Sequence, residues 1–98
     1  MSTGERAARV LVAGELDLAT APSLERALSG ALEAADDVVL DLASLTFIDS
    51  SGLSAILAGV SASHLNGGRL VISSTLAPQP RKLFELAGMG GILPFVDE

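Results

Sequence analysis

Two hydrophobic periods alternate along the chain and together predict an α/β fold. Short apolar, β-prone runs indicate strands at 10–13, 38–42 and 69–74, with a last short strand at 92–96. Between them, apolar residues recur at helical spacing and indicate helices within 20–35, 50–68 and 78–91. This order, with short connections, predicts a mostly parallel or mixed sheet of about four strands, flanked by helices.

Local signals predict where several of these elements begin and end. Gly14 is expected to end the first strand, and Thr20 to cap the helix that follows, with Pro22 in its first turn. Pro80 is expected to shift the start of the third helix, because a proline lacks the N–H group that a helix interior needs.

Length and composition favour a single domain, 1–98, that opens with a short segment, 1–9. The chain has no cysteine, which is compatible with a reducing cytoplasm, the expected location. Its apolar runs are too short to span a bilayer and no signal peptide opens it, so no membrane insertion is expected. The net charge of -6 and three aromatic residues, without a basic stripe, argue against nucleic-acid binding.

Three loops follow predicted strands, namely "GELDLAT", "SLTFIDSSG" and "SSTLAPQP". In parallel sheets, ligands gather beyond the carboxyl ends of the strands, so these loops are expected to converge on one surface. Scattered carboxylates do not make a metal site, and the glycine pairs lack the lysine and hydroxyl of a phosphate loop. No cofactor and no metal are therefore expected.

The stretch "FIDSSGL" allows two interpretations. Asp49, Ser50 and Ser51 precede a helical stripe that starts at Leu53, and these are the residue types that cap helices. Alternatively, a serine at a helix start is a good place for a phosphate, because free amide groups and the helix dipole favour an anion. Gly52 would then leave the backbone accessible beside it, and the phosphate would meet the like charge of Asp49 and Asp17.

Enzymatic chemistry is not expected. Ser51 and His64 are the only nucleophile and base to consider, and on one helix they lie 13 residues apart, or about 20 Å at 1.5 Å per residue. A nucleophile and its base need hydrogen-bond contact.

The second helix also carries many small, uncharged residues. They are either packed on several sides within the domain or form a flat surface for a protein partner. The residues in question are Ser54, Ala55, Ala58, Gly59, Ser61 and Ala62.

Over residues 10–96 the chain resembles a STAS domain, and most closely a bacterial anti-sigma factor antagonist. The blocks that carry the resemblance are "VAGELDLATAPSLERAL", "VVLDLASLTFIDSSGLSAIL", "NGGRLVISS" and "RKLFELAGM". The resemblance implies binding to an anti-sigma factor that is also a serine kinase, which frees a sigma factor. It implies that the kinase phosphorylates Ser51 and so ends the binding, and that a separate phosphatase restores it.

The resemblance also implies which residues form the site. Asp17, Asp49 and Ser50, with Gly52 and Leu53, would support the phosphoacceptor and bind the partner. The ATP would belong to the kinase, so this chain would be a substrate and not an enzyme.

The chain departs from the family pattern in places. Family members often have a further strand before Val10, which "MSTGERAA" is not expected to form, and an edge left open in this way would favour a dimer. The stretch "AGVSASH" stands where many members have basic residues, which puts partner contacts there in doubt. The alternative function within the family is a STAS subunit of a membrane lipid-transport ATPase complex.

Overall fold

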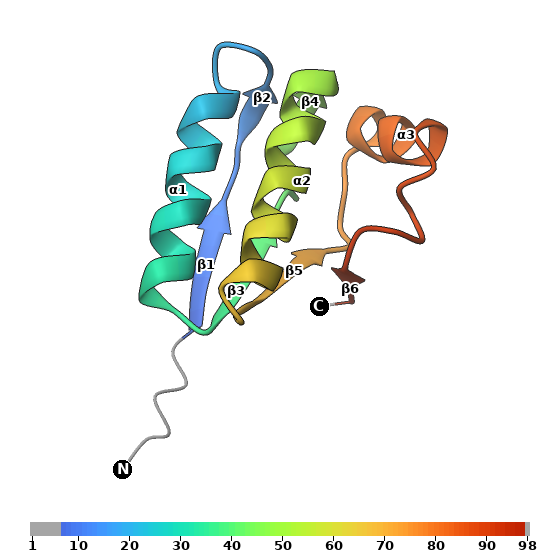
Figure 1. Ribbon diagram of the computed structural model, residues 1–98. Helices are drawn as coiled ribbons and strands as arrows, with labels where there is room; N and C mark the ends of the chain where they lie inside the picture. The colour runs from blue at the N-terminus through green and yellow to red at the C-terminus, as the bar shows by residue number, and fades with distance from the viewer. Residues whose placement is uncertain (1–6, 98) are drawn as a thin grey trace.

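The computed structural model describes residues 7–97, which alternate strands and helices (Figure 1). The elements are β1 (Ala7–Leu11), β2 (Gly14–Leu16), α1 (Ala21–Ala34), β3 (Asp37–Asp41), β4 (Leu45–Ile48), α2 (Ser50–Leu65), β5 (Arg69–Ser73), α3 (Pro78–Leu86) and β6 (Phe95–Val96). Within these residues, no helix is both long and apolar enough to cross a membrane.

Four strands form the main sheet in the order β1-β3-β5-β6, and every neighbouring pair is parallel. The predicted α/β fold with a mostly parallel four-stranded sheet is thereby confirmed. Helices α1 and α2 lie side by side over one face of this sheet, and α3 lies beyond α2 (Figure 1).

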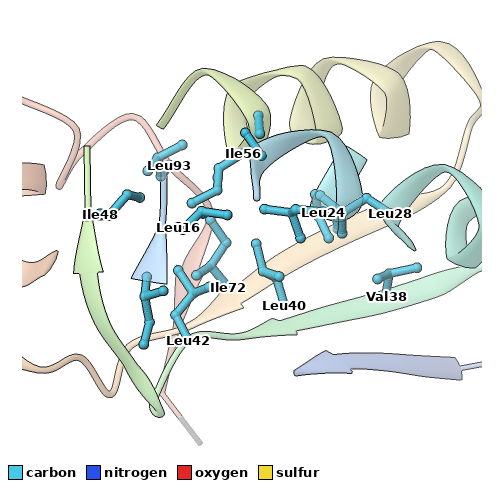
Figure 2. Packing of buried hydrophobic residues seen from close by; sticks show 14 of the residues in the cluster. Leu16, Leu24, Leu28, Val38, Leu40, Leu42, Ile48, Ile56, Ile72 and Leu93 are labelled. Atoms are coloured by element: carbon cyan, nitrogen blue, oxygen red, sulfur yellow. The ribbon is translucent and has the colours of Figure 1, made fainter. Parts of the chain in front are cut away.

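The hydrophobic core fills the space between the sheet and the helices. Alternate residues of β3 and β5 point into it, as the two-residue period of a strand requires. The side chains that meet there come from the main sheet, from β2 and β4, and from α1 and α2 (Figure 2). The labelled members are Leu16, Leu24, Leu28, Val38, Leu40, Leu42, Ile48, Ile56, Ile72 and Leu93.

Two short strands were missing from the sequence prediction. The stretches expected to be plain loops contain β2 and β4, which pair in parallel as a second, two-stranded sheet. The predicted first strand at 10–13 instead begins at Ala7 and ends at Leu11. Gly14, expected to end it, has a positive φ of 80° and opens β2, with a register shift after it. Ala7 and Ala8, from the stretch "MSTGERAA" that was not expected to form a strand, belong to β1, and residues 1–6 lie outside the described part.

The bend at Gly14 leaves the two neighbouring chain segments hydrogen-bonded. The N–H of Val12 donates to the carbonyl of Asp41 at 3.0 Å, and the N–H of Gly14 donates to the carbonyl of Ser44 at 3.1 Å. The pairing of β1 with β3 therefore continues around the bend into the pairing of β2 with β4.

Two expectations about helix starts were wrong. Thr20 occupies the N-cap position of α1 but its side chain makes no capping bond, since its hydroxyl oxygen instead accepts the N–H of Asp17 at 2.8 Å. Helix α3 is not shifted by Pro80, since it begins at Pro78 and both prolines lie in its first turn. The N–H groups of a first turn have no acceptor within the helix, so proline is tolerated there.

The small residues of α2 divide between two faces. Ala55 and Gly59 are buried, and a Cβ at Gly59 would come within 2.6 Å of a methyl carbon of Leu28 on α1. This face fits the interpretation of a helix packed within the domain. Ser54, Ala58 and Ser61 are exposed and form the uncharged outer face.

Gly52 fixes how closely the start of α2 approaches β2. A Cβ at this position would lie 2.7 Å from the backbone oxygen of Leu16 and 2.8 Å from a side-chain carbon of Ile48. Because a backbone atom is one of these neighbours, a larger residue cannot be accommodated by a side-chain movement alone.

We expect Gly52→Ala to lower the free energy of unfolding by about 1–3 kcal/mol, since it overpacks this contact. The matched control is Gly30→Ala, in the interior of α1 with open space around it. It should raise stability by roughly 0.5–1 kcal/mol, because glycine is the poorer helix former. Urea denaturation of both variants measures the difference, and equal stabilities would contradict the proposed close approach.

An ion pair joins the first two strands of the main sheet. Arg9 Nη2 lies 3.0 Å from Asp41 Oδ2, and Asp41 Oδ1 accepts the N–H of Ala43 at 3.0 Å. The Ala43 bond, aided by Arg9 and opposed by loss of hydration, lowers the pKa of Asp41 below its usual value.

A lowered pKa in the folded state stabilises the fold above the pKa of the unfolded chain, which is about 3.9 for aspartate. This contribution is lost as the pH falls through the lower pKa of the folded state. We therefore expect Asp41→Asn to be less stable than the wild type at pH 6, and the gap to shrink below about pH 4. Urea denaturation at both pH values tests this, with Asp37→Asn, an exposed aspartate of the same strand, as control.

Candidate functional site

Three loop segments meet at the start of α2. The N–H of Asp49 donates to the carbonyl of Leu16 at the end of β2, at 3.2 Å. The side chain of Gln79, in the first turn of α3, forms two hydrogen bonds with the backbone of Ile48. The expectation that "GELDLAT", "SLTFIDSSG" and "SSTLAPQP" converge is thus confirmed, and they converge around Asp49.

Asp49 caps α2. Its backbone is extended, with φ -118° and ψ -171°, and its Oδ1 accepts the N–H of Gly52 at 3.1 Å. Its carbonyl oxygen accepts the N–H of Leu53 at 3.0 Å, the first bond of the helix. Of the residues that could have capped this helix, the aspartate does so, and neither serine is needed for it.

The two serines occupy the first turn of α2. Ser50 is exposed and Ser51 is half-buried. Neither hydroxyl has a side-chain hydrogen bond to another residue of the described range 7–97. The first turn of a helix carries amide groups without acceptors and the positive end of the helix dipole. An anionic group on Ser51 would therefore meet a favourable main-chain field.

Gly52 and Leu53 differ in solvent exposure: Gly52 is buried and Leu53 is partly exposed. The expectation that Gly52 leaves the backbone accessible is wrong, because Gly52 is buried against Leu16 and Ile48. Leu53 is partly exposed and packs against the hydrophobic core. Gly52 thus holds the helix start on β2, and Leu53 can present only part of its side chain to a partner.

Asp17 organises the loop between β2 and α1. Its Oδ1 accepts hydrogen bonds from the N–H groups of Ala19 and Thr20, both at 3.1 Å, and from the Thr20 hydroxyl at 3.0 Å. Because the neighbouring Leu16 accepts the N–H of Asp49, Asp17 stands beside the start of α2. One end of the molecule therefore carries this loop together with the first turn of α2 (Figure 1).

Sequence reasoning missed two residues of this region. Leu18, at the tip of the Asp17 loop, is 77% exposed, and sequence reasoning did not single it out. Gln79 was not singled out, although it is the only glutamine in the chain. A polar residue between two prolines was the available signal, but it does not reveal a contact 31 residues away.

Two further features concern the chemistry of the described residues. Ser51 and His64 lie at opposite ends of α2, as expected. Within residues 7–97 no three histidine or acidic side chains gather in a way that could hold a metal ion.

Comparisons with known proteins agree with the fold and cover nearly the whole chain. The family model described as "Mlab, STAS domain" matches residues 2–94. An anti-sigma F factor antagonist of Paenibacillus polymyxa is 30% identical over 90 residues, which are 90% of this chain and 76% of that protein.

Solved structures give the same picture. The unphosphorylated anti-sigma factor antagonist SpoIIAA matches with a TM-score of 0.76 at 26% identity, covering 100% of this chain and 84% of the other. The phosphorylated form of SpoIIAA, from Bacillus, matches with a TM-score of 0.70, at 26% identity and with 100% and 86% covered. An anti-sigma factor antagonist from Mycobacterium paratuberculosis matches with a TM-score of 0.75 at 27% identity, with 100% and 81% covered. The sequence match, the sheet order and these structures lead to one conclusion: the chain belongs to the STAS domain family.

Proposed function

We propose that this protein is an anti-sigma factor antagonist whose binding is switched off by phosphorylation of Ser51. In this proposal it binds an anti-sigma factor that is also a serine kinase, and so releases a sigma factor for transcription. The kinase supplies the ATP, a separate phosphatase removes the phosphate, and the cytoplasm is where these partners meet. The names of the relatives support the binding function, and one of the similar structures is a phosphorylated form.

One observation carries the proposed switch. The side chain of Asp49 makes the capping bond of α2, so the hydroxyl of Ser51 has no structural task among the described residues. If Ser51 were the cap, its hydroxyl would be engaged with an amide of the helix start and less available to a kinase. With Asp49 as cap, Ser51 can accept a phosphate while α2 stays folded.

The charge of the phosphate explains why binding would stop. A phosphoserine adds about two negative charges at neutral pH. The first turn of α2 can hold it through amide groups, but it stands two residues from the carboxylate of Asp49. A partner surface shaped for a neutral serine would have to bury this charge without a counter-ion. The loss of the complex therefore follows from desolvation and requires no change of fold.

The site also fits a binding partner in its shape and chemistry. Leu18 offers an exposed apolar side chain, and Leu53 a partly exposed one, next to the acidic groups of Asp17 and Asp49. An apolar centre with charged residues around it is a common arrangement for a specific protein interface. Asp17, Asp49, Ser50 and Leu53 are therefore proposed to support the phosphoacceptor and contact the partner, with Gly52 holding them in place.

We expect Ser51→Asp to weaken the complex with the anti-sigma kinase by about 100-fold or more, because burying an unpaired charge at an interface costs about 2–5 kcal/mol. Ser51→Ala should bind as the wild type does. The matched control is Ser61→Asp, which adds the same charge at an exposed position late in the same helix. Pull-downs with the four baits, followed by titration of the purified partner, measure the difference.

The recovered partner also provides the second measurement. Incubated with ATP, it should transfer phosphate to the wild type and not to Ser51→Ala, as mass spectrometry would show. A partner that binds all four baits equally would contradict the switch. A transporter ATPase recovered with all of them would instead support the alternative of a transport-complex subunit.

A further inference from the structure

Strand β4 has two edges, and β2 covers only one of them. In a strand, the backbone groups of successive residues point to opposite edges. The N–H of Asp49 donates to Leu16 of β2, so the N–H and carbonyl of the preceding Ile48 face the other edge. No described strand pairs with β4 on that side.

Gln79 occupies this second edge. Its Oε1 accepts the N–H of Ile48 at 2.9 Å, and its Nε2 donates to the carbonyl of Ile48 at 2.9 Å. A side-chain amide has the same planar donor and acceptor as a peptide group. Gln79 therefore makes the two bonds that one residue of a neighbouring strand would make.

The segment that carries Gln79 is itself firmly held. Pro78 and Pro80 flank it in the first turn of α3, and proline fixes its own φ angle. Pro80 and Phe84 are buried, and the ring of Phe84 packs edge-on against Phe95 at 5.6 Å between centroids. The amide of Gln79 is thus attached to an element anchored in the core.

We propose that Gln79 is a positioning residue that couples α3 to the start of α2. The chain leads from Ile48 directly to Asp49, the cap of α2, and then to Ser51. Gln79 sets the position of Ile48 and through it the presentation of the Ser51 hydroxyl. A negative charge on Ser51 repels the carboxylate of Asp49 and so loosens the hold of Gln79 on Ile48. This coupling rests on the proposed function in one respect: phosphorylation is taken as the natural source of the negative charge on Ser51.

The amide composition of the chain allows a direct test without any partner. The sequence has one glutamine, Gln79, and one asparagine, Asn66, and both residues are exposed, so that the hydrogen bonds of Gln79 distinguish them. A ¹⁵N-correlated NMR spectrum therefore contains two side-chain carboxamide NH₂ groups, one in the proposed contact and one as an internal reference. We expect the NH₂ of Gln79 to exchange with solvent about five- to tenfold more slowly than that of Asn66, the protection that one hydrogen bond gives. Equal exchange rates would overturn the contact.

The coupling is tested with the charge variant. In Ser51→Asp, exchange of the Gln79 NH₂ and of the Ile48 N–H should become several-fold faster, whereas Ser61→Asp should leave both unchanged. If Ser51→Asp and Ser61→Asp behave alike, Gln79 only stabilises the edge of β4 and the coupling is refuted. This result would leave the phosphorylation of Ser51 untouched, because no kinase takes part in the experiment.

A substitution of Gln79 separates positioning from stability. Gln79→Glu keeps the shape and the acceptor for Ile48 but loses the donor, and it places a carboxylate against a carbonyl. Its folded fraction is checked by circular dichroism, with Gln79→Ala as a second variant in case the first does not fold. The Ser51 amide resonance should shift in the folded variant while that of His64, at the far end of α2, stays in place. An unmoved Ser51 resonance would contradict the proposal.

Discussion

The site depends on one main-chain contact, the pairing of β2 with β4 that brings the N–H of Asp49 to the carbonyl of Leu16. This pairing sets the end of one loop beside the start of α2, and a glycine at position 52 is the condition under which the helix can come so close. The acidic loop, the cap and the two serines are neighbours because of it. The positions of the residues in the candidate switch are thus set mainly by backbone contacts, namely the pairing of β2 with β4 and the close approach at Gly52.

In the proposed function, capping and modification are divided between Asp49 and Ser51 of one motif. An aspartate that caps a helix satisfies an amide and also keeps a negative charge at the positive end of the dipole. Ser51, two residues further on, then keeps its hydroxyl free among the described residues, in the same first turn of α2. The positive end of the α2 dipole, which favours the Asp49 carboxylate, would also favour a phosphate on Ser51. Because Asp49 is already negative, however, a phosphate beside it would repel that carboxylate and disturb the surrounding contacts.

The sequence predicts the parts of this fold that depend on regular patterns. The helices and the strands at β3 and β5 follow from apolar periodicity, and the start of α2 follows from the residue types around Asp49. Strands β2 and β4 escape prediction because they have three and four residues, too few to establish a period, and because their pairing depends on a bend at Gly14. The contact of Gln79 with Ile48 joins positions far apart in the chain, which no local pattern encodes.

Helix α2 is pinned at two points, by Gly52 against β2 and by Gly59 against Leu28 of α1. At Gly52 the nearest atom is a backbone oxygen, and at Gly59 it is a methyl carbon of Leu28, so a shift of the helix would press on both neighbours. We therefore expect a change at the first turn to be taken up more easily by β4, which has four residues and, among the described strands, pairs only with β2, than by α2. We expect α2 to keep its position and the four residues of β4, which lead into it, to be the part of the site that adjusts.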